Sequence, residues 1–187
     1  DRSPSRGLGD AYKRQEQEAR AKAAELPQLR FHMIGQIQTK KANHVARWAA
    51  SVHSLDSLKL AQALERGVAL AKERGERESN LPVFVQVSAD GDDARGGVSR
   101  HALDELVEAV EGSEHLDFAG LMVVPPLDAD AGEVFRGVRD EVDRLSAALK
   151  RPLKLSAGMS ADMAEAIAAG SDIVRVGTSI MGPRPVG

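Results

Sequence analysis

The sequence predicts an α/β protein of the (β/α)8 barrel type. Short apolar runs of strand length alternate along the chain with longer stretches that have the period of a helix. The short runs are apolar at successive positions, as in a parallel sheet that is covered on both faces. The last two runs each lead into a Gly/Ser turn, at 156–160 and 177–179. Barrels of this type often build an anion site from the loops after their last two strands.

Six strands are expected in this order, joined by right-handed crossovers. The run that starts at residue 51 has the weakest signal because it mixes polar and apolar residues. The expected strands are Phe31–Ile34, Ser51–Leu55, Val83–Val87, Phe118–Val124, Leu153–Leu155 and Ile173–Val176.

Helices are expected between the strands because apolar residues recur there at spacings of three and four. A first helix is expected over about residues 10–25 and a short one over Ala161–Ala169. The three clearest apolar stripes are Leu60, Ala61, Leu64, Val68 and Ala71; Leu103, Leu106, Val107 and Val110; and Val134, Phe135, Val138, Val142, Leu145 and Leu149.

An open doubly wound sheet is the competing architecture. The barrel is favoured because no G-x-G-x-x-G motif follows the first strand. Six strands do not close an eight-stranded barrel, and each buried unpaired edge group would cost about 1–3 kcal/mol. We therefore expect a single, N-terminally incomplete domain over residues 1–187, in which one or two strands precede this sequence or Ser3–Asp10 supplies a vestigial one.

Composition narrows the class of protein. A net charge of −3 provides no general attraction to nucleic acid or to anionic membranes. The chain has no Cys, so disulfides, thiolate catalysis and Cys–zinc sites are excluded. No apolar run approaches the roughly 20 residues of a membrane helix, and Asp1–Asp10 lacks the apolar core of a signal peptide. A cytoplasmic monomer or weak dimer is expected.

A metal site is not expected. Asp90-Gly91-Asp92-Asp93 begins like a calcium loop, but His101 stands where that loop needs Glu. The histidines show neither H-E-x-x-H nor facial-triad spacing. They are His32, His44, His53, His101 and His115.

The two Gly/Ser turns are the first candidate site. If the fifth and sixth strands are parallel neighbours, both turns lie at one end of the sheet and offer N–H groups and hydroxyls to an anion. Gly158 is suited to a positive φ or to a close ligand, and Ser160 is suited to cap a helix that begins at Ala161. A plain strand–helix connection explains the same residues equally well.

Arg175 and Gly35 are further candidates. Arg175 lies inside an apolar strand, and a guanidinium is costly to bury without a partner. It is therefore expected to face a carboxylate, a ligand or the barrel mouth, and a structural ion pair is an equal alternative. Gly35, with Gln36 and Gln38, follows the first strand and would line the carboxyl end of the sheet, although a polar loop is the simpler explanation.

Five segments in order resemble the motifs of the pyridoxal-phosphate homeostasis protein family, which is related to the N-terminal barrel of alanine racemase. The resemblance covers residues 9–182, and the five motifs together are far more specific than any one of them. The segments are Phe31–Lys41 (W-H-F-I-G-x-L-Q-x-N-K), Val52–Ser57 (I-H-S-V-D-S), Gly120–Met122 followed after two residues by Pro125 (similar to G-L-M-x-x-x-P), Ser156–Ser160 (S-M-G-M-S) and Val174–Thr178 (V-R-I-G-T).

The resemblance implies a barrel that holds pyridoxal 5′-phosphate at its C-terminal mouth, as a carrier or buffer without strong catalysis. Its phosphate would meet the turn at Ser156, Gly158, Met159 and Ser160, together with Gly177 and Thr178, and Gly35 would line the mouth. Arg175 would approach the pyridine nitrogen and keep it unprotonated, which weakens the ring as an electron sink.

The sequence departs from the family pattern at three places. No V-S-K segment carries the family's cofactor-binding lysine, and Lys40, Lys41 and Lys154 are poor substitutes. Ala11 replaces the Asn of G-E-N-Y, and Lys40 replaces the Asn of Q-x-N-K. The first departure removes the expected point of covalent attachment.

Two other readings stay open. An amino-acid racemase or another phosphate-ligand barrel enzyme would need an acid/base pair, for which only His32 and His53 are candidates. Racemases of this type also take a Tyr base from a second domain, whereas the only Tyr here is Tyr12. A fragment or interaction module without a ligand is the third reading.

Overall fold

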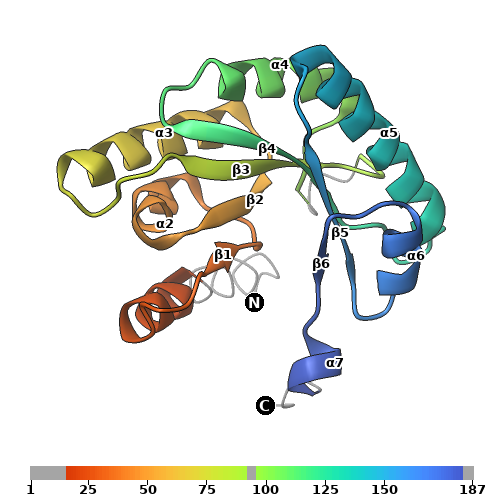
Figure 1. Cartoon of the computed structure of the whole chain (residues 1–187), viewed down its shortest axis with the longest axis horizontal. Coiled ribbons are helices and arrows are strands. Elements are labelled where there is room, and N and C mark those ends of the chain that lie inside the picture. The colour runs from red at the N-terminus through yellow and green to blue at the C-terminus, as the bar shows by residue number, and fades with distance from the viewer. Residues whose placement is uncertain (1–15, 92–95, 183–187) are drawn as a thin grey trace, which may run out of the picture.

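The computed structural model of the chain describes residues 16–91 and 96–182, in which helices and strands alternate (Figure 1). Residues 16–25 are helical. The elements that follow are β1 (His32–Met33), the 3-10 helix η1 (Thr39–Lys41), α2 (Ala42–Trp48), β2 (Ser51–Leu55), α3 (Leu58–Glu73), β3 (Leu81–Val87), α4 (Arg100–Glu111), β4 (Leu116–Val123), α5 (Ala131–Leu149), β5 (Lys154–Met159), α6 (Met163–Ala168), β6 (Ile173–Arg175) and α7 (Thr178–Met181).

The six strands form one parallel sheet in the order β1-β2-β3-β4-β5-β6. The order in the sheet equals the order in the chain, whereas a doubly wound sheet reverses its order at a switch point. The sheet curls into a half-barrel with the helices on its convex side, and β1 and β6 are its two edges (Figure 1). This confirms the (β/α) barrel architecture.

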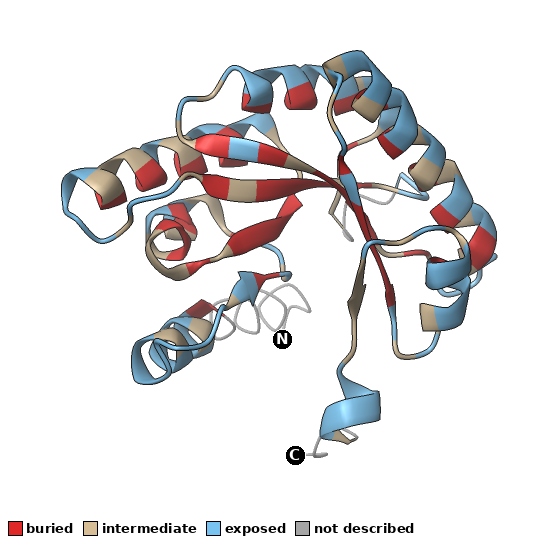
Figure 2. Ribbon diagram, viewed as in Figure 1, coloured by how far each residue is buried: buried red, intermediate tan, exposed pale blue. Residues whose placement is uncertain are grey.

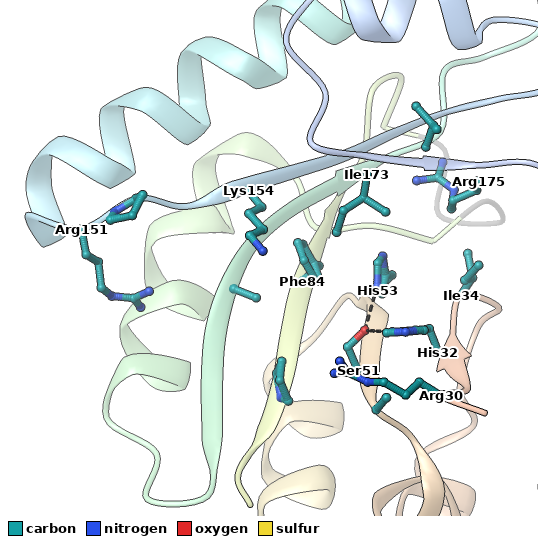
Figure 3. A pocket seen from close by; sticks show the side chains of 15 residues that line it. Arg30, His32, Ile34, Ser51, His53, Phe84, Arg151, Lys154, Ile173 and Arg175 are labelled. Carbon is teal, nitrogen blue, oxygen red and sulfur yellow. Dashed lines mark hydrogen bonds between the residues drawn. The ribbon is translucent and has the colours of Figure 1, made fainter. Parts of the chain in front are cut away.

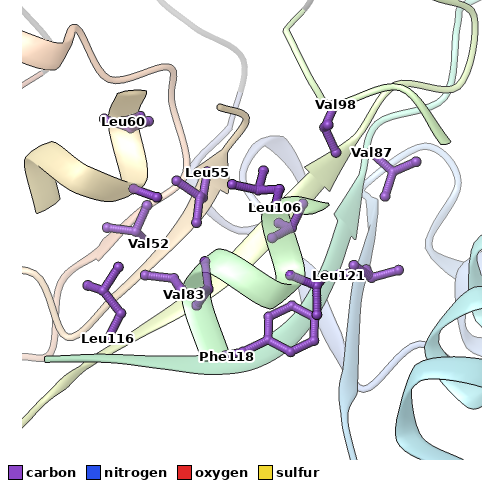
Figure 4. Close-up of a cluster of buried hydrophobic side chains, with 14 of the residues drawn as sticks. Val52, Leu55, Leu60, Val83, Val87, Val98, Leu106, Leu116, Phe118 and Leu121 are labelled. Carbon is purple, nitrogen blue, oxygen red and sulfur yellow. The ribbon is translucent and has the colours of Figure 1, made fainter. Parts of the chain in front are cut away.

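The main core lies between the convex face of the sheet and the helices. Buried residues follow the strands and the helix stripes that meet them (Figure 2), and Leu106 and Phe118 pack together there (Figure 4). The stripe residues Leu64 and Val142 have no exposed surface. Burying an apolar side chain of this size contributes about 1.5–3 kcal/mol. The helical periodicity thus predicted which residues form this core.

Side-chain caps fix where two of the long helices begin. Ser57 accepts a hydrogen bond from the backbone N–H of Leu60 at 3.3 Å, at the start of α3. Asp130 accepts one from Glu133 N–H at 3.0 Å, at the start of α5. Each cap satisfies a backbone donor that the helix itself leaves unpaired.

Several expected boundaries are wrong. β5 runs on through Met159, so most of the segment expected to be a turn is strand. α6 begins at Met163 rather than Ala161, and its N-cap is Asp162 rather than Ser160. Ser3–Asp10, Ala11 and Tyr12 lie outside the described residues. Within the described ranges, no helix could span a membrane and no cluster of metal-ligating side chains occurs.

Candidate functional site

The turns after β5 and β6 lie side by side at the same end of the sheet. The two strands are parallel neighbours, with Ser156 opposite Ile173 and Met159 opposite Arg175. The backbone N–H of Ser179 donates to Ser160 Oγ at 3.4 Å, which joins the two turns directly. Gly177 and Thr178 are exposed there, and α7 begins at Thr178. The structure therefore brings Ser160, Gly177 and Thr178 together.

Ser171 and Asp172 hold the two strands in this arrangement. Asp172 accepts the N–H of Leu155 at 2.7 Å, and the Ser171 hydroxyl accepts the N–H of Ala157 at 3.2 Å. Arg139 of α5 also contacts the Asp172 carboxylate at 3.2 Å. These bonds bridge the interrupted ladder between β5 and β6. Neither residue stands out in the sequence, because a Ser-Asp pair before a strand resembles any loop.

Gly158 has the positive φ that the sequence predicts, at +91°. A Cβ built at this position would lie 2.5 Å from Ala166 Cβ of α6. Real Cβ atoms do not approach each other so closely, so the packing of α6 against β5 requires glycine here. The neighbour that demands the glycine is a helix of the chain itself.

A carboxylate stands beside the same turn. The N–H of Met159 donates to Asp162 Oδ1 at 2.6 Å, so this backbone donor already has a partner. Asp162 is also the carboxylate whose field acts on Arg175, where it opposes the lowering of the arginine pKa by burial. Asp162 lies just outside the Ser156–Ser160 motif, and its role is not visible in the sequence.

Arg175 is held by neutral oxygens. Its Nη1 donates to the carbonyl oxygen of Ser156 at 2.9 Å and to Ser156 Oγ at 3.0 Å, and its Nη2 donates to the carbonyl oxygen of Val123 at 3.0 Å. Among the described residues Arg175 makes no ion pair, and the partners seen there are these three neutral oxygens. Burial lowers the pKa of Arg175. The guanidinium is thus a fixed cation beneath the two turns.

His53 lies on the concave side of β2, next to the edge strand β1, and is 3% exposed. Its ring stacks on Phe84, with 4.3 Å between the ring centroids. Its Nδ1 is 2.9 Å from Ser156 Oγ, and its Nε2 is 2.8 Å from Ser51 Oγ, which is in turn 2.7 Å from His32 Nδ1. Burial, followed by the charges of His32 and Arg175, lowers the pKa of His53 to about 4.

A cavity of about 500 Å³ opens in front of these groups, inside the half-barrel (Figure 3). Among the described residues, its lining includes four basic side chains and no carboxylate: Arg30, Arg151, Lys154 and Arg175. Lys154 points into the cavity from the first position of β5 (Figure 3). Of the lysines considered as points of attachment, Lys41 pairs with Glu16 at 3.6 Å and Lys40 lines an outer groove with Asn43.

Gly35 is not brought close to the two turns. It follows β1, the opposite edge strand from β6, and its carbonyl oxygen accepts a hydrogen bond from Ser54 Oγ at 2.7 Å. Gln36 beside it hydrogen-bonds to Asp56, whose pKa is raised mainly by burial. This polar group lies at the carboxyl ends of β1 and β2, so the candidate residues divide between the two sides of the mouth.

The sequence and the structure both match known proteins. Residues 8–185 match the model of the alanine racemase N-terminal domain. A pyridoxal phosphate homeostasis protein from Corynebacterium glutamicum is 54% identical over 96% of this chain and 82% of its own length. Its counterpart in Mycobacterium tuberculosis is 43% identical over 96% of this chain and 74% of its own length.

Solved structures agree with this match. PipY of Synechococcus elongatus, solved with PLP bound, superposes with a TM-score of 0.77 at 32% identity, over 89% of this chain and 78% of that one. An alanine racemase from Clostridium difficile superposes with a TM-score of 0.62 at 18% identity, over 89% of this chain and 44% of that one. The second likeness concerns the fold alone.

Proposed function

The chain belongs to the alanine racemase N-terminal domain family, among the pyridoxal phosphate homeostasis proteins, and we propose that it binds pyridoxal 5′-phosphate as a carrier or buffer. The observation that carries the proposal is the joining of the two turns after β5 and β6 directly above Arg175. Hydroxyl and backbone donors for a phosphate and a fixed guanidinium for a ring thus lie on neighbouring strands.

The residues present fit the phosphate end of this cofactor. Gly177 has open space around it, because a Cβ built there would meet no atom within 4 Å. Ser160, Gly177 and Thr178 would hold the phosphate, while Met159 would do so only if its N–H left Asp162. Gly158 and Ser156 shape the turn from below, and Gly35 lines the opposite rim. When bound, the cofactor supplies an aldehyde and an electron-withdrawing ring.

Arg175 has a defined role in this proposal. Its guanidinium donates hydrogen bonds and does not lose a proton near neutral pH. Placed at the ring nitrogen, it leaves that nitrogen unprotonated and so limits the electron-sink chemistry of the ring. An arginine at this position therefore favours binding of the cofactor rather than catalytic turnover.

The test is a calorimetric titration of the chain with pyridoxal 5′-phosphate and, in parallel, with pyridoxal, which lacks the phosphate. We expect micromolar binding of the first and at least tenfold weaker binding of the second. Ser160→Asp, which places a negative charge at the turn, should abolish binding, and the exposed Ser79→Asp serves as its control. Equal affinity for both compounds, or no binding of either, would overturn the proposal.

Covalent attachment is tested separately. Borohydride reduction followed by peptide mapping identifies any lysine that holds the cofactor. Lys154 alone of the three lysines faces the cavity, but it is the first residue of β5, whereas Ser160 follows the last residue of that strand. At about 3.3 Å per residue the two ends lie about 20 Å apart, which is farther than a lysine side chain and the cofactor reach together. None of the three lysines should therefore be labelled while Ser160 holds the phosphate, and labelling of any of them would contradict this placement of the cofactor.

The carrier role differs from the racemase alternative in one measurement. Cofactor-loaded protein should release pyridoxal 5′-phosphate to an apoenzyme without racemising L-alanine, and measurable racemisation would favour the enzyme.

A single cofactor-binding domain over residues 1–187, a monomeric or weakly dimeric state and a cytoplasmic location are parts of the same proposal. Limited proteolysis, sedimentation velocity and cell fractionation test them in turn.

A further inference from the structure

Five polar side chains form an unbroken hydrogen-bonded series across the lumen. It starts at Arg175 on β6, passes through Ser156, His53 and Ser51, and ends at His32 on β1. Every step is between 2.7 and 3.0 Å. The series therefore connects the two edge strands of the half-barrel, and Figure 3 shows its part from His53 through Ser51 to His32.

The chemistry of Arg175 sets the direction of this series. A guanidinium has only donors, so Ser156 Oγ is the acceptor of the 3.0 Å bond from Nη1. Ser156 has one hydroxyl proton, and its remaining partner is Nδ1 of His53 at 2.9 Å. If Nδ1 of His53 also donated to Ser156 Oγ, the hydroxyl proton of Ser156 would have no acceptor among the described residues. A buried donor without an acceptor is costly. Nδ1 is therefore the acceptor.

The same reasoning extends to the far end. A neutral imidazole with an accepting Nδ1 carries its proton on Nε2, so His53 donates to Ser51 Oγ at 2.8 Å. Ser51 in turn donates its own proton to His32 Nδ1 at 2.7 Å. Burial independently favours the neutral form of His53. Each group in the series therefore donates to the next one, from Arg175 at one end to His32 at the other.

We propose that His53 is a positioning residue for Arg175: by accepting the Ser156 proton, it turns the lone pairs of that hydroxyl toward the guanidinium. The hydroxyl is one of three acceptors that hold Arg175, and the other two are backbone carbonyls that side-chain changes leave in place. Loss of the His53 acceptor frees Ser156 to rotate and loosens one end of the guanidinium. The effect on the cofactor rests on the proposed function, whereas the direction of the series does not.

The direction is tested without any cofactor. Two-bond ¹H–¹⁵N correlation spectra of the histidine rings at pH 7 should show His53 as the neutral tautomer with its proton on Nε2. In Ser156→Ala this preference should weaken, while exposed His101 serves as an internal reference in both spectra. A proton on Nδ1 of His53, or a charged ring at pH 7, would overturn the inference.

The positioning role is tested with a matched pair of variants. His53→Asn keeps an acceptor near the site of Nδ1, whereas His53→Phe keeps the stacking on Phe84 and removes the acceptor. We expect His53→Phe to weaken binding of pyridoxal 5′-phosphate about fivefold to tenfold, and to leave the affinity for inorganic phosphate unchanged. His53→Asn should stay within about twofold of the parent.

Each outcome has a separate meaning. A parallel loss of inorganic phosphate binding in His53→Phe would show a general structural role and contradict positioning, as would equal behaviour of the two variants. If His53→Phe does not fold, Ser156→Ala provides the same comparison, because it removes the intermediate hydroxyl. Failure of the parent chain to bind the cofactor overturns the proposed function, whereas the tautomer spectra still decide the direction of the series.

Discussion

The two faces of the sheet are built on different principles. On the convex face, side chains such as Val52 and Phe118 pack against helices through contacts without direction. On the concave face, the next residues along the strands, His53 and Ala119, face a cavity, and His53 is held by directed hydrogen bonds. Alternation along a strand separates the two chemistries by a single residue.

The convex face provides most of the stability, and the concave face carries the candidate function. Apolar contacts on the convex face tolerate small adjustments and contribute most of the folding free energy. A directed network loses its arrangement when one member changes its protonation state. We therefore expect the convex face to control unfolding at every pH, and the concave face to respond to pH.

The largest effect is expected on the convex face. Phe118→Ala should lower the free energy of unfolding by about 3–5 kcal/mol, because the ring is 2% exposed and its removal leaves a cavity. Urea titration measures this change. Leu29→Ala, at a position that is 52% exposed, should change it by no more than about 0.5 kcal/mol. A loss below about 1 kcal/mol for Phe118→Ala would place the core elsewhere.

The concave face should make the protein sensitive to acid. The pKa of His53 is about 4 in the folded chain and 6.5 in its ordinary state, so between these values the unfolded chain binds the extra proton. The contribution of the neutral His53 ring to the free energy of unfolding is complete above pH 6.5 and is lost as the pH falls towards 4. The total loss is about 3 kcal/mol, at roughly 1.4 kcal/mol per pKa unit.

The measurement is the free energy of unfolding against pH for the parent chain and for His53→Phe. The curve of the variant should be flatter over this range, and His101→Phe should follow the parent. Comparing the two curves cancels Asp56, whose raised pKa acts in the opposite sense. His32 and Arg175 also face this region, and they repel a proton on His53 in the parent. Lys154 lines the same cavity. Identical slopes would refute the buried neutral imidazole.

A smaller loss of stability is expected at Gly158, where α6 packs against β5. Gly158→Ala places a Cβ against Ala166 and holds a non-glycine residue at a φ of +91°. We expect a loss of about 2 kcal/mol in the free energy of unfolding. Gly177→Ala has open space and a φ of −119°, so thermal unfolding should detect almost no change. Equal effects of the two substitutions would contradict this packing.

The smallest effect concerns affinity. Asp162→Asn keeps an acceptor for the Met159 N–H and removes a negative charge beside the candidate phosphate turn. Binding of inorganic phosphate, measured by calorimetry, should tighten about fivefold, which corresponds to about 1 kcal/mol of relieved repulsion. Exposed Asp128→Asn is the matched control. Unchanged or weaker binding would mean that the phosphate does not approach this turn.

The two faces also differ in how far the sequence predicted them. Helical periodicity is a local pattern, so apolar stripes such as Leu64 and Val68 predict the residues of the convex core. The predicted bounds of the Ser51–Leu55 strand are also correct at both ends. The bond between His53 and Ser156 joins residues 103 positions apart, and no local pattern contains it. The family motifs include Ser156 and Arg175. Their hydrogen-bond partners became visible only in three dimensions, as did the roles of Ser171 and Asp172.

The crowding around Gly158 and the open space around Gly177 have a consequence for redesign of the mouth. A helix is packed against the first glycine, so of these two positions only the second, on the exposed flank, has room for added side-chain volume. A series of increasing side-chain size at position 177 would act as a molecular ruler for the anion, excluding larger groups first while the scaffold beneath stays intact.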